Sequence, residues 1–166
     1  MENSNQNKNR FQIEENSDND SVSEYDDIFC QESVKEVAHL TYMINSNMCL
    51  NRDVSRLHYE KGMHLSSVGN YSDAVECFNK AIEIDHHHAD SYYRKGEILR
   101  TFLNDSKAAV IALDEAIRIN PNHVEAYSTH GYALMDLGRY EDAVKSFDRI
   151  ITINFSNRVQ AAYDIF

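Results

Sequence analysis

The sequence predicts an all-α protein built from stacked helical hairpins. The first reason is an internal repeat: Gly62, Gly96 and Gly131 occupy matching places in three similar stretches, spaced 34 and then 35 residues apart. A period of this length is typical of helical repeat proteins. The second reason is composition, because the 166 residues are 42% apolar and include a single proline, the residue that most strongly interrupts helices.

The three copies agree at apolar and small positions, which are the positions that pack. They span about residues 55–88, 89–123 and 124–157. Besides the glycine, the matching residues are, copy by copy, Leu65, Ala74, Phe78 and Ala81; Leu99, Ala109, Leu113 and Ala116; and Leu134, Ala143, Phe147 and Ile150. A glycine inside a helix costs about 1 kcal/mol relative to alanine. Three matched glycines therefore indicate that a second helix packs closely against each of them.

This pattern resembles the tetratricopeptide repeat (TPR) family over about residues 53–157. Two features depart from the family pattern. The proline near the end of each repeat appears only as Pro121, with His86 and Phe155 in the matching places, and the middle copy has one extra residue in its turn. The resemblance implies helix-turn-helix units in a right-handed superhelix, in which each unit covers the apolar face of its neighbour.

Six helices are expected within the repeats, and local signals mark several of their ends. The expected ranges are 54–67, 71–84, 89–102, 106–119, 123–136 and 140–153. Gly69 and Gly138 follow the first helix of their hairpins, where a left-handed backbone conformation favours glycine. Asp53 and Asp105 are candidate N-caps.

The first 52 residues differ from the repeats. Residues 1–27 contain eight acidic residues against Lys8 and Arg10, and too few apolar ones to form a core, so we expect a disordered acidic tail. Residues 28–52 carry an apolar stripe at helical spacing that includes Val37 and Ile44. We interpret this segment as a helix that caps the first repeat. A degenerate repeat and a helix for dimerisation or partner binding are the alternatives.

Residues 158–166 begin like a fourth repeat that stops short. Val159, Ala162, Tyr163 and Phe166 would share one face of a helix. We expect a brief C-terminal capping helix, and the domain as a whole to span residues 53–166. So short a helix leaves an apolar edge open, which suggests self-association or a bound partner there.

Charge and composition exclude several classes of function. The net charge of −11 argues against nucleic acid and anionic membranes as partners, since both bind basic surfaces. No apolar run is long enough for membrane insertion, and no apolar segment follows the N-terminal charges as in a secretory signal. Cys30, Cys49 and Cys77 lack metal or redox spacing and are interpreted as reduced thiols. A cytoplasmic location is therefore expected.

The sequence offers little for catalysis or cofactor binding. The histidines at 86–88 are the most noticeable polar cluster, but consecutive side chains in a turn cannot all reach one ion, and zinc takes three or four ligands from spaced positions. Phosphate-binding loops, zinc-protease motifs and nucleophile elbows are missing from the sequence. We therefore expect that the protein is not an enzyme and that it has no metal site and no cofactor.

The TPR resemblance implies a binding surface on the first helix of each hairpin, along the concave wall. Transferring the family's usual contact positions gives the candidate residues Arg56, Tyr59, Met63, Tyr93, Glu97, Arg100, Ser128, Tyr132 and Met135. Tyrosine and arginine dominate binding energy at interfaces, and methionine adapts its shape to a ligand. We expect a protein-interaction module, an adaptor or a chaperone-like protein, that binds a partner's peptide or helix in this groove.

Two functions found within the TPR family, and one structural role, are the alternatives to this interpretation. Co-chaperone TPR domains hold acidic C-termini with Lys, Arg and Asn, whereas the same positions here are Tyr59, Met63, Glu97, Glu125 and Thr129. A bound peptide should therefore be apolar with some basic character. TPR chaperones of type III secretion translocators are similar in length, acidity and layout. Homo-oligomerisation through the terminal helices is the structural alternative.

Overall fold

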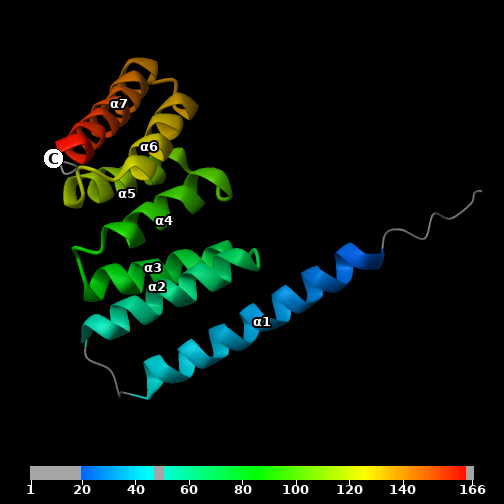
Figure 1. The fold of residues 1–166 in the computed structure, drawn as a ribbon. Helices are drawn as coiled ribbons and strands as arrows, with labels where there is room; N and C mark the ends of the chain where they lie inside the picture. The colour runs from blue at the N-terminus through cyan, green and yellow to red at the C-terminus, as the bar shows by residue number, and fades with distance from the viewer. Residues whose placement is uncertain (1–19, 47–50, 164–166) are drawn as a thin grey trace, which may run out of the picture.

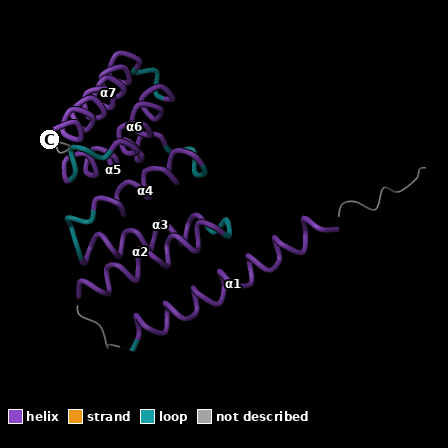
Figure 2. Tube along the Cα trace, in the orientation of Figure 1, coloured by secondary structure: helices purple, strands orange, loops and turns teal. Residues whose placement is uncertain are grey.

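A computed structural model of the protein describes residues 20–46 and 51–163, and the regular secondary structure in this part of the chain is all α-helical (Figures 1 and 2). Its elements are α1 (Asp20–Asn45), α2 (Asn51–Ser67), α3 (Tyr71–Ile84), α4 (Ala89–Thr101), α5 (Ser106–Ile119), α6 (Val124–Asp136) and α7 (Tyr140–Tyr163). Three hairpins, α2–α3, α4–α5 and α6–α7, stack into a solenoid, which confirms the all-α prediction. None of the described helices is long and apolar enough to cross a membrane.

In each hairpin, the two helices pack closely together at the repeated glycine. A Cβ atom added at Gly62 would lie 2.7 Å from Phe78 Cε1, and one added at Gly96 would lie 2.6 Å from Leu113 Cγ. Phe78 and Leu113 are completely buried, and each belongs to one of the two apolar clusters of the core. The close approach of the two helices explains why a residue with no side chain recurs at this position.

The turns within the hairpins follow the expected chemistry. Gly69 and Gly138 have positive φ angles of 79° and 73°, and they end α2 and α6 as predicted. The longer turn of the middle repeat uses Asn104 instead, with φ at 58°. Asp105 caps α5 as predicted, because its Oδ1 accepts a hydrogen bond from the backbone N–H of Ala108 at 3.0 Å.

The N-terminal elements depart from the expected boundaries. The helix α1 begins at Asp20, so residues 20–27 are helical rather than part of a disordered tail; the expected tail at 1–19 lies outside the described residues. The low apolar content that predicted disorder does not by itself exclude a helix, because the backbone hydrogen bonds of a helix are made within the segment. Likewise α2 begins at Asn51, which places Asp53 in the first turn instead of at the N-cap.

The C-terminal repeat also ends differently from the expectation. Instead of a helix ending at residue 153 and a separate short helix from 158, α7 continues without interruption to Tyr163. The TPR pattern would place a proline where this chain has Phe155, and phenylalanine keeps the N–H group that a helix needs. Because no proline or glycine follows within α7, nothing in the local sequence breaks the helix.

At the other end of the solenoid, α1 packs against α2 (Figure 1). Leu40 is buried in this contact, and Val37 reaches the apolar cluster around Phe78. Buried Ser33 adds a hydrogen bond with Ser67 across the two helices, at 3.4 Å between hydroxyl oxygens. The side chains of α1 thus extend the core of the first repeat.

Candidate protein-binding surface

The candidate binding residues lie on the first helices of the hairpins, α2, α4 and α6, but their exposure differs widely. Tyr132 and Met135 on α6 are exposed, with 48% of the Tyr132 surface accessible. Tyr93 on α4 is only 9% exposed and belongs to the core cluster with Leu113. The same residue type therefore serves as surface in one repeat and as core in the preceding one.

The remaining candidates lie between these extremes. Tyr59 and Met63 are half-buried against the Phe78 cluster, and Arg56 is exposed, paired with Glu60 at 3.1 Å. The other half-buried members of the set are Glu97, Arg100 and Ser128. The structure thus brings Glu97, Arg100, Tyr132 and Met135 onto adjoining helices.

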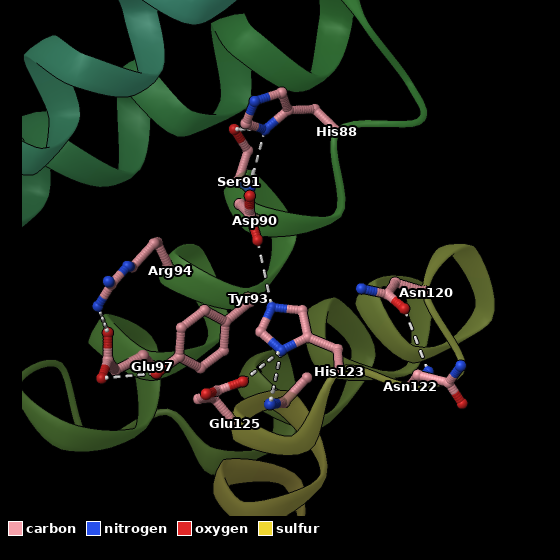
Figure 3. Close-up of polar contacts among 11 residues, drawn as sticks. His88, Asp90, Ser91, Tyr93, Arg94, Glu97, Asn120, Asn122, His123 and Glu125 are labelled. Carbon is pink, nitrogen blue, oxygen red and sulfur yellow. Dashed lines mark hydrogen bonds and ion pairs between the residues drawn. The ribbon is translucent and has the colours of Figure 1, made fainter. Parts of the chain in front are cut away.

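Two histidines in the turns between repeats account for the burial of the tyrosines. The ring of His88 lies 5.0 Å from that of Tyr59. The ring of His123 lies 4.8 Å from that of Tyr93 (Figure 3). Both histidines are also N-caps: Nδ1 of His88 accepts from the N–H of Ser91 at 3.1 Å, and Nδ1 of His123 accepts from that of Ala126 at 3.4 Å. The sequence signal was a histidine immediately before the second and third repeats.

His123 lies between two acidic side chains from different repeats. Its Nε2 lies 3.3 Å from Asp90 Oδ1 at the start of α4, and its Nδ1 lies 3.1 Å from Glu125 Oε2 on α6 (Figure 3). His88 is engaged in capping, and within residues 20–46 and 51–163 no group of three His, Cys, Asp or Glu side chains is arranged to hold a metal ion. The turn histidines therefore fix how one repeat sits on the next.

On α4, Glu97 organises two neighbouring side chains. Its Oε1 accepts the hydroxyl proton of Tyr93 at 3.2 Å, and its Oε2 accepts from Arg94 Nη1 at 3.0 Å (Figure 3). Burial, together with the charge of Glu97, raises the pKa of Tyr93 to about 12, so the phenol stays protonated as the donor. The guanidinium of Arg94, which the sequence did not single out, also lies 5.1 Å from the centre of the Tyr93 ring.

A second group connects α4 to α6. Arg100 Nη1 lies 3.3 Å from Asp136 Oδ2, and the same guanidinium lies over the Tyr132 ring, 5.5 Å from its centre. Ser106 also donates to Asp136, at 3.2 Å. These helices border a polar cavity of ≈ 630 Å³, which is lined by Arg100, Thr101, Asn104, Asp105, Ser106, Lys107, Asp136 and Leu137.

On the other side of α6, three polar side chains connect three helices. His130 Nε2 lies 3.1 Å from Asp114 Oδ1 on α5, and His130 Nδ1 lies 2.9 Å from Ser146 Oγ on α7. The Asp–His–Ser order resembles a hydrolase triad, but Ser146 is buried in the middle of a helix, where the neighbouring backbone N–H groups are used within the helix. This arrangement therefore links α5, α6 and α7.

Comparison with protein families agrees with the repeat structure. Two tetratricopeptide repeat models match the chain, one at residues 55–88 and the other at residues 89–123 and 124–157. The chain belongs to the tetratricopeptide repeat family. This family is typically a non-enzymatic protein-interaction fold. Each of the three matched ranges covers most of one hairpin.

Individual relatives are distant and longer than this chain. Small glutamine-rich tetratricopeptide repeat-containing protein 2 of Mycosarcoma maydis is 28% identical over 99 residues, which are 60% of this chain and 28% of that protein. The STIP1 homolog of Dictyostelium discoideum is 32% identical over 89 residues, 54% of this chain and 16% of that protein. This chain therefore spans less than a third of either relative.

Among solved structures, the second TPR of Spaghetti (RPAP3), bound to the HSP90 peptide SRMEEVD, superimposes with a TM-score of 0.60. The match covers 62% of this chain and 94% of that one, at 19% sequence identity. At this identity the likeness shows the fold alone, that of a TPR solenoid.

Proposed function

We propose that this chain is an adaptor or chaperone-like protein that holds an apolar segment with basic side chains, from a partner protein, against α4 and α6. The observation that carries the proposal is the exposed pair Tyr132 and Met135 on the wall formed by these helices. Membership of a protein-interaction family supports the general class of function.

Tyr132 has the properties of a rigid anchor for a ligand. Its ring is held from one side by the Arg100 guanidinium and from another by the edge-on ring of Phe147, at 5.4 Å between centroids. Asp136 in turn holds Arg100. An aromatic side chain that is already ordered loses little conformational entropy on binding, so more of its contact energy appears as affinity.

Acidic side chains elsewhere on the wall determine which segment fits. Asp90, Glu97 and Glu125 surround the buried pair of Tyr93 and His123, and Glu125 is largely exposed (Figure 3). The HSP90 peptide bound by the second TPR of Spaghetti (RPAP3), SRMEEVD, contains three acidic residues. Acidic side chains on the wall of this chain would repel such a peptide and attract one that carries lysine or arginine.

The proposal can be tested by selecting ligands from a displayed library of random peptides. We expect the selected peptides to combine apolar residues with lysine or arginine. The double variant Tyr132→Ala, Met135→Ala should then lose binding by about tenfold or more, because it removes the anchor. Tyr42→Ala on α1 is the matched control, since this tyrosine is also exposed but lies on a different helix.

A charge variant separates the anchor from the acidic surroundings. Glu125→Lys should reduce the preference for basic peptides while it leaves the helical circular dichroism unchanged, because the Glu125 side chain is exposed. Selection of acidic peptides, or full binding by the double variant, would show that the partner binds elsewhere. Tyr93→Ala is unsuitable for this purpose because Tyr93 is part of the core.

A further inference from the structure

The outer face of α7 carries a stripe of mostly apolar side chains. The spacing between the members of this stripe is the same whether it is counted from the N-terminal or the C-terminal end. Its members are separated by 4, 4, 3, 4 and 4 residues, which keeps them on one side of the helix: Tyr140, Val144, Asp148, Ile151, Phe155 and Val159. Every one of these six side chains is exposed, and five of them are apolar. So many exposed apolar side chains on one face are typical of an interaction surface.

In the first two repeats, the corresponding face is covered by the next repeat. Val110 on α5 occupies the same repeat position as Val144 on α7, yet Val110 is 7% exposed and Val144 is 56% exposed. Tyr71 on α3, which corresponds to Tyr140, stacks on Phe102 at the end of α4 with ring centroids 3.8 Å apart. The face of α7 therefore has the shape that accepts another helix in this fold.

The helix α7 is also longer than its counterparts. It has 24 residues, whereas α3 and α5 have 14 each. Among the described helices, only α6 packs extensively against it. The additional turns extend the stripe through Phe155 and Val159. Because an isolated helix is only marginally stable in water, these turns would gain stability from a partner along the stripe.

The charges of α7 point to a second copy of this chain as that partner. The chain carries a net charge of −11, so two copies repel each other across most surfaces. The helix α7, in contrast, has no net charge. Its three acidic residues, Glu141, Asp142 and Asp148, are balanced by three basic residues, Lys145, Arg149 and Arg158. Two α7 helices can therefore approach each other without the repulsion that other pairs of surfaces would meet.

The order of residues along α7 is self-complementary in an antiparallel pair. A two-fold axis between Arg149 and Ile150 places Tyr140 opposite Val159 of the other copy, and Val144 opposite Phe155. The same register places Glu141 opposite Arg158, twice by symmetry. Antiparallel helix dipoles add to the attraction. Asp148, opposite Ile151, is the polar member of the stripe and limits its strength.

We propose that two copies of this chain associate through the outer faces of α7, in an antiparallel arrangement about a two-fold axis. Such an interface presents the same residues from both copies, as two-fold interfaces do. One helix from each copy makes a small interface, so we expect a dissociation constant on the order of micromolar. The proposal does not depend on the peptide partner proposed above, because α4 and α6 stay accessible. A dimer would present two binding walls and gain affinity for a partner with two matching segments.

Sedimentation across the micromolar concentration range tests the dimer. We expect a monomer–dimer equilibrium for the full chain, shifted at least tenfold towards monomer by Ile151→Glu, because this change buries a charge in the interface. Ile111→Glu on α5 is the matched control, since Ile111 is 68% exposed and Ile151 is 67% exposed. The control should leave the equilibrium unchanged, and all proteins should keep the same helical circular dichroism.

Charge exchange tests the register. Glu141→Arg alone and Arg158→Glu alone should each weaken the dimer several-fold, because each places like charges together. An equimolar mixture of the two variants should restore association, because every contact in the mixed dimer again joins opposite charges. A chain that stays monomeric over the whole range would overturn the proposal. The proposal would also be overturned by a dimer that Ile151→Glu does not weaken. A mixture of the two charge variants that associates no more strongly than either variant alone would overturn it as well.

Discussion

The two ends of the solenoid differ in what lies over them. At the N-terminal end, α1 packs on α2, Leu40 is buried and Phe78 is completely enclosed. At the C-terminal end, no described helix covers the outer face of α7, and Ile151 is exposed although Ile117 at the same repeat position packs against the core. Repeat position therefore sets the direction of a side chain, while the neighbouring repeat sets its burial.

Weakening the contact between α1 and α2 at the N-terminal end should change stability the most. Leu40→Ala should lower the free energy of unfolding by about 2–3 kcal/mol, because it leaves a cavity between α1 and α2. Ile151→Ala at the open end should change it by less than about 0.5 kcal/mol. Urea unfolding followed by circular dichroism, at concentrations low enough for monomer, measures both. Equal effects would mean that the two ends are not different in stability.

A smaller difference is expected between the glycines of the first and third repeats. Gly62→Ala would push Cβ against enclosed Phe78, at a cost of about 2–3 kcal/mol that is partly offset by about 1 kcal/mol of helix propensity. Gly131→Ala meets Phe147, which is half-buried and can shift outwards, so its net effect should stay near zero. Thermal unfolding of both variants provides the comparison. A larger loss at Gly131 would contradict the view that the third repeat is less enclosed.

The effect of pH on stability should be smaller still, and it acts through one histidine in the first repeat and one in the third. Burial lowers the pKa of His58, and nearby Lys80 and Lys61 lower it further. Burial also lowers the pKa of His130, but Asp114 opposes this shift. In both cases the unfolded state binds the proton more strongly, so the free energy of unfolding should fall as the pH drops below 6.5, through the lowered pKa of the folded state.

Substitution by glutamine isolates these contributions. His58→Gln should flatten the pH dependence of stability between neutral and mildly acidic pH, and His130→Gln should flatten it less, because Asp114 already favours the protonated form of His130. Urea unfolding at several pH values measures the slopes. The reverse order, or stability that rises as the pH falls, would disagree with the environments of the two side chains.

Much of the fold could be predicted because helical repeats are encoded locally. The ranges of α3 and α5 were predicted to the residue, and the helix end at Gly69 followed from the backbone conformation that glycine permits. The continuation of α7 through Phe155 could not be predicted with the same certainty. The lack of proline there permits a helix but does not require one, and the TPR pattern favoured a turn.

The candidate site was harder to predict than the fold. The TPR pattern selected the wall-facing positions of α2, α4 and α6, yet it could not distinguish Tyr93 from Tyr132. Tyr93 is buried because His123, from the next turn, lies against its ring. The sequence placed that histidine in the turn but contained no signal that it would cap α6 and contact α4 at once.

The three hairpins follow from the sequence alone, because helix periodicity, the repeated glycines and the turn residues act over a few residues at a time. Tertiary contacts, in contrast, set which members of a repeated position are core and which are surface. Burial depends on whether another helix lies over a side chain, and that helix comes from a different repeat. Val110 and Val144 show the result: the same residue at the same position is packed in one repeat and open in the next.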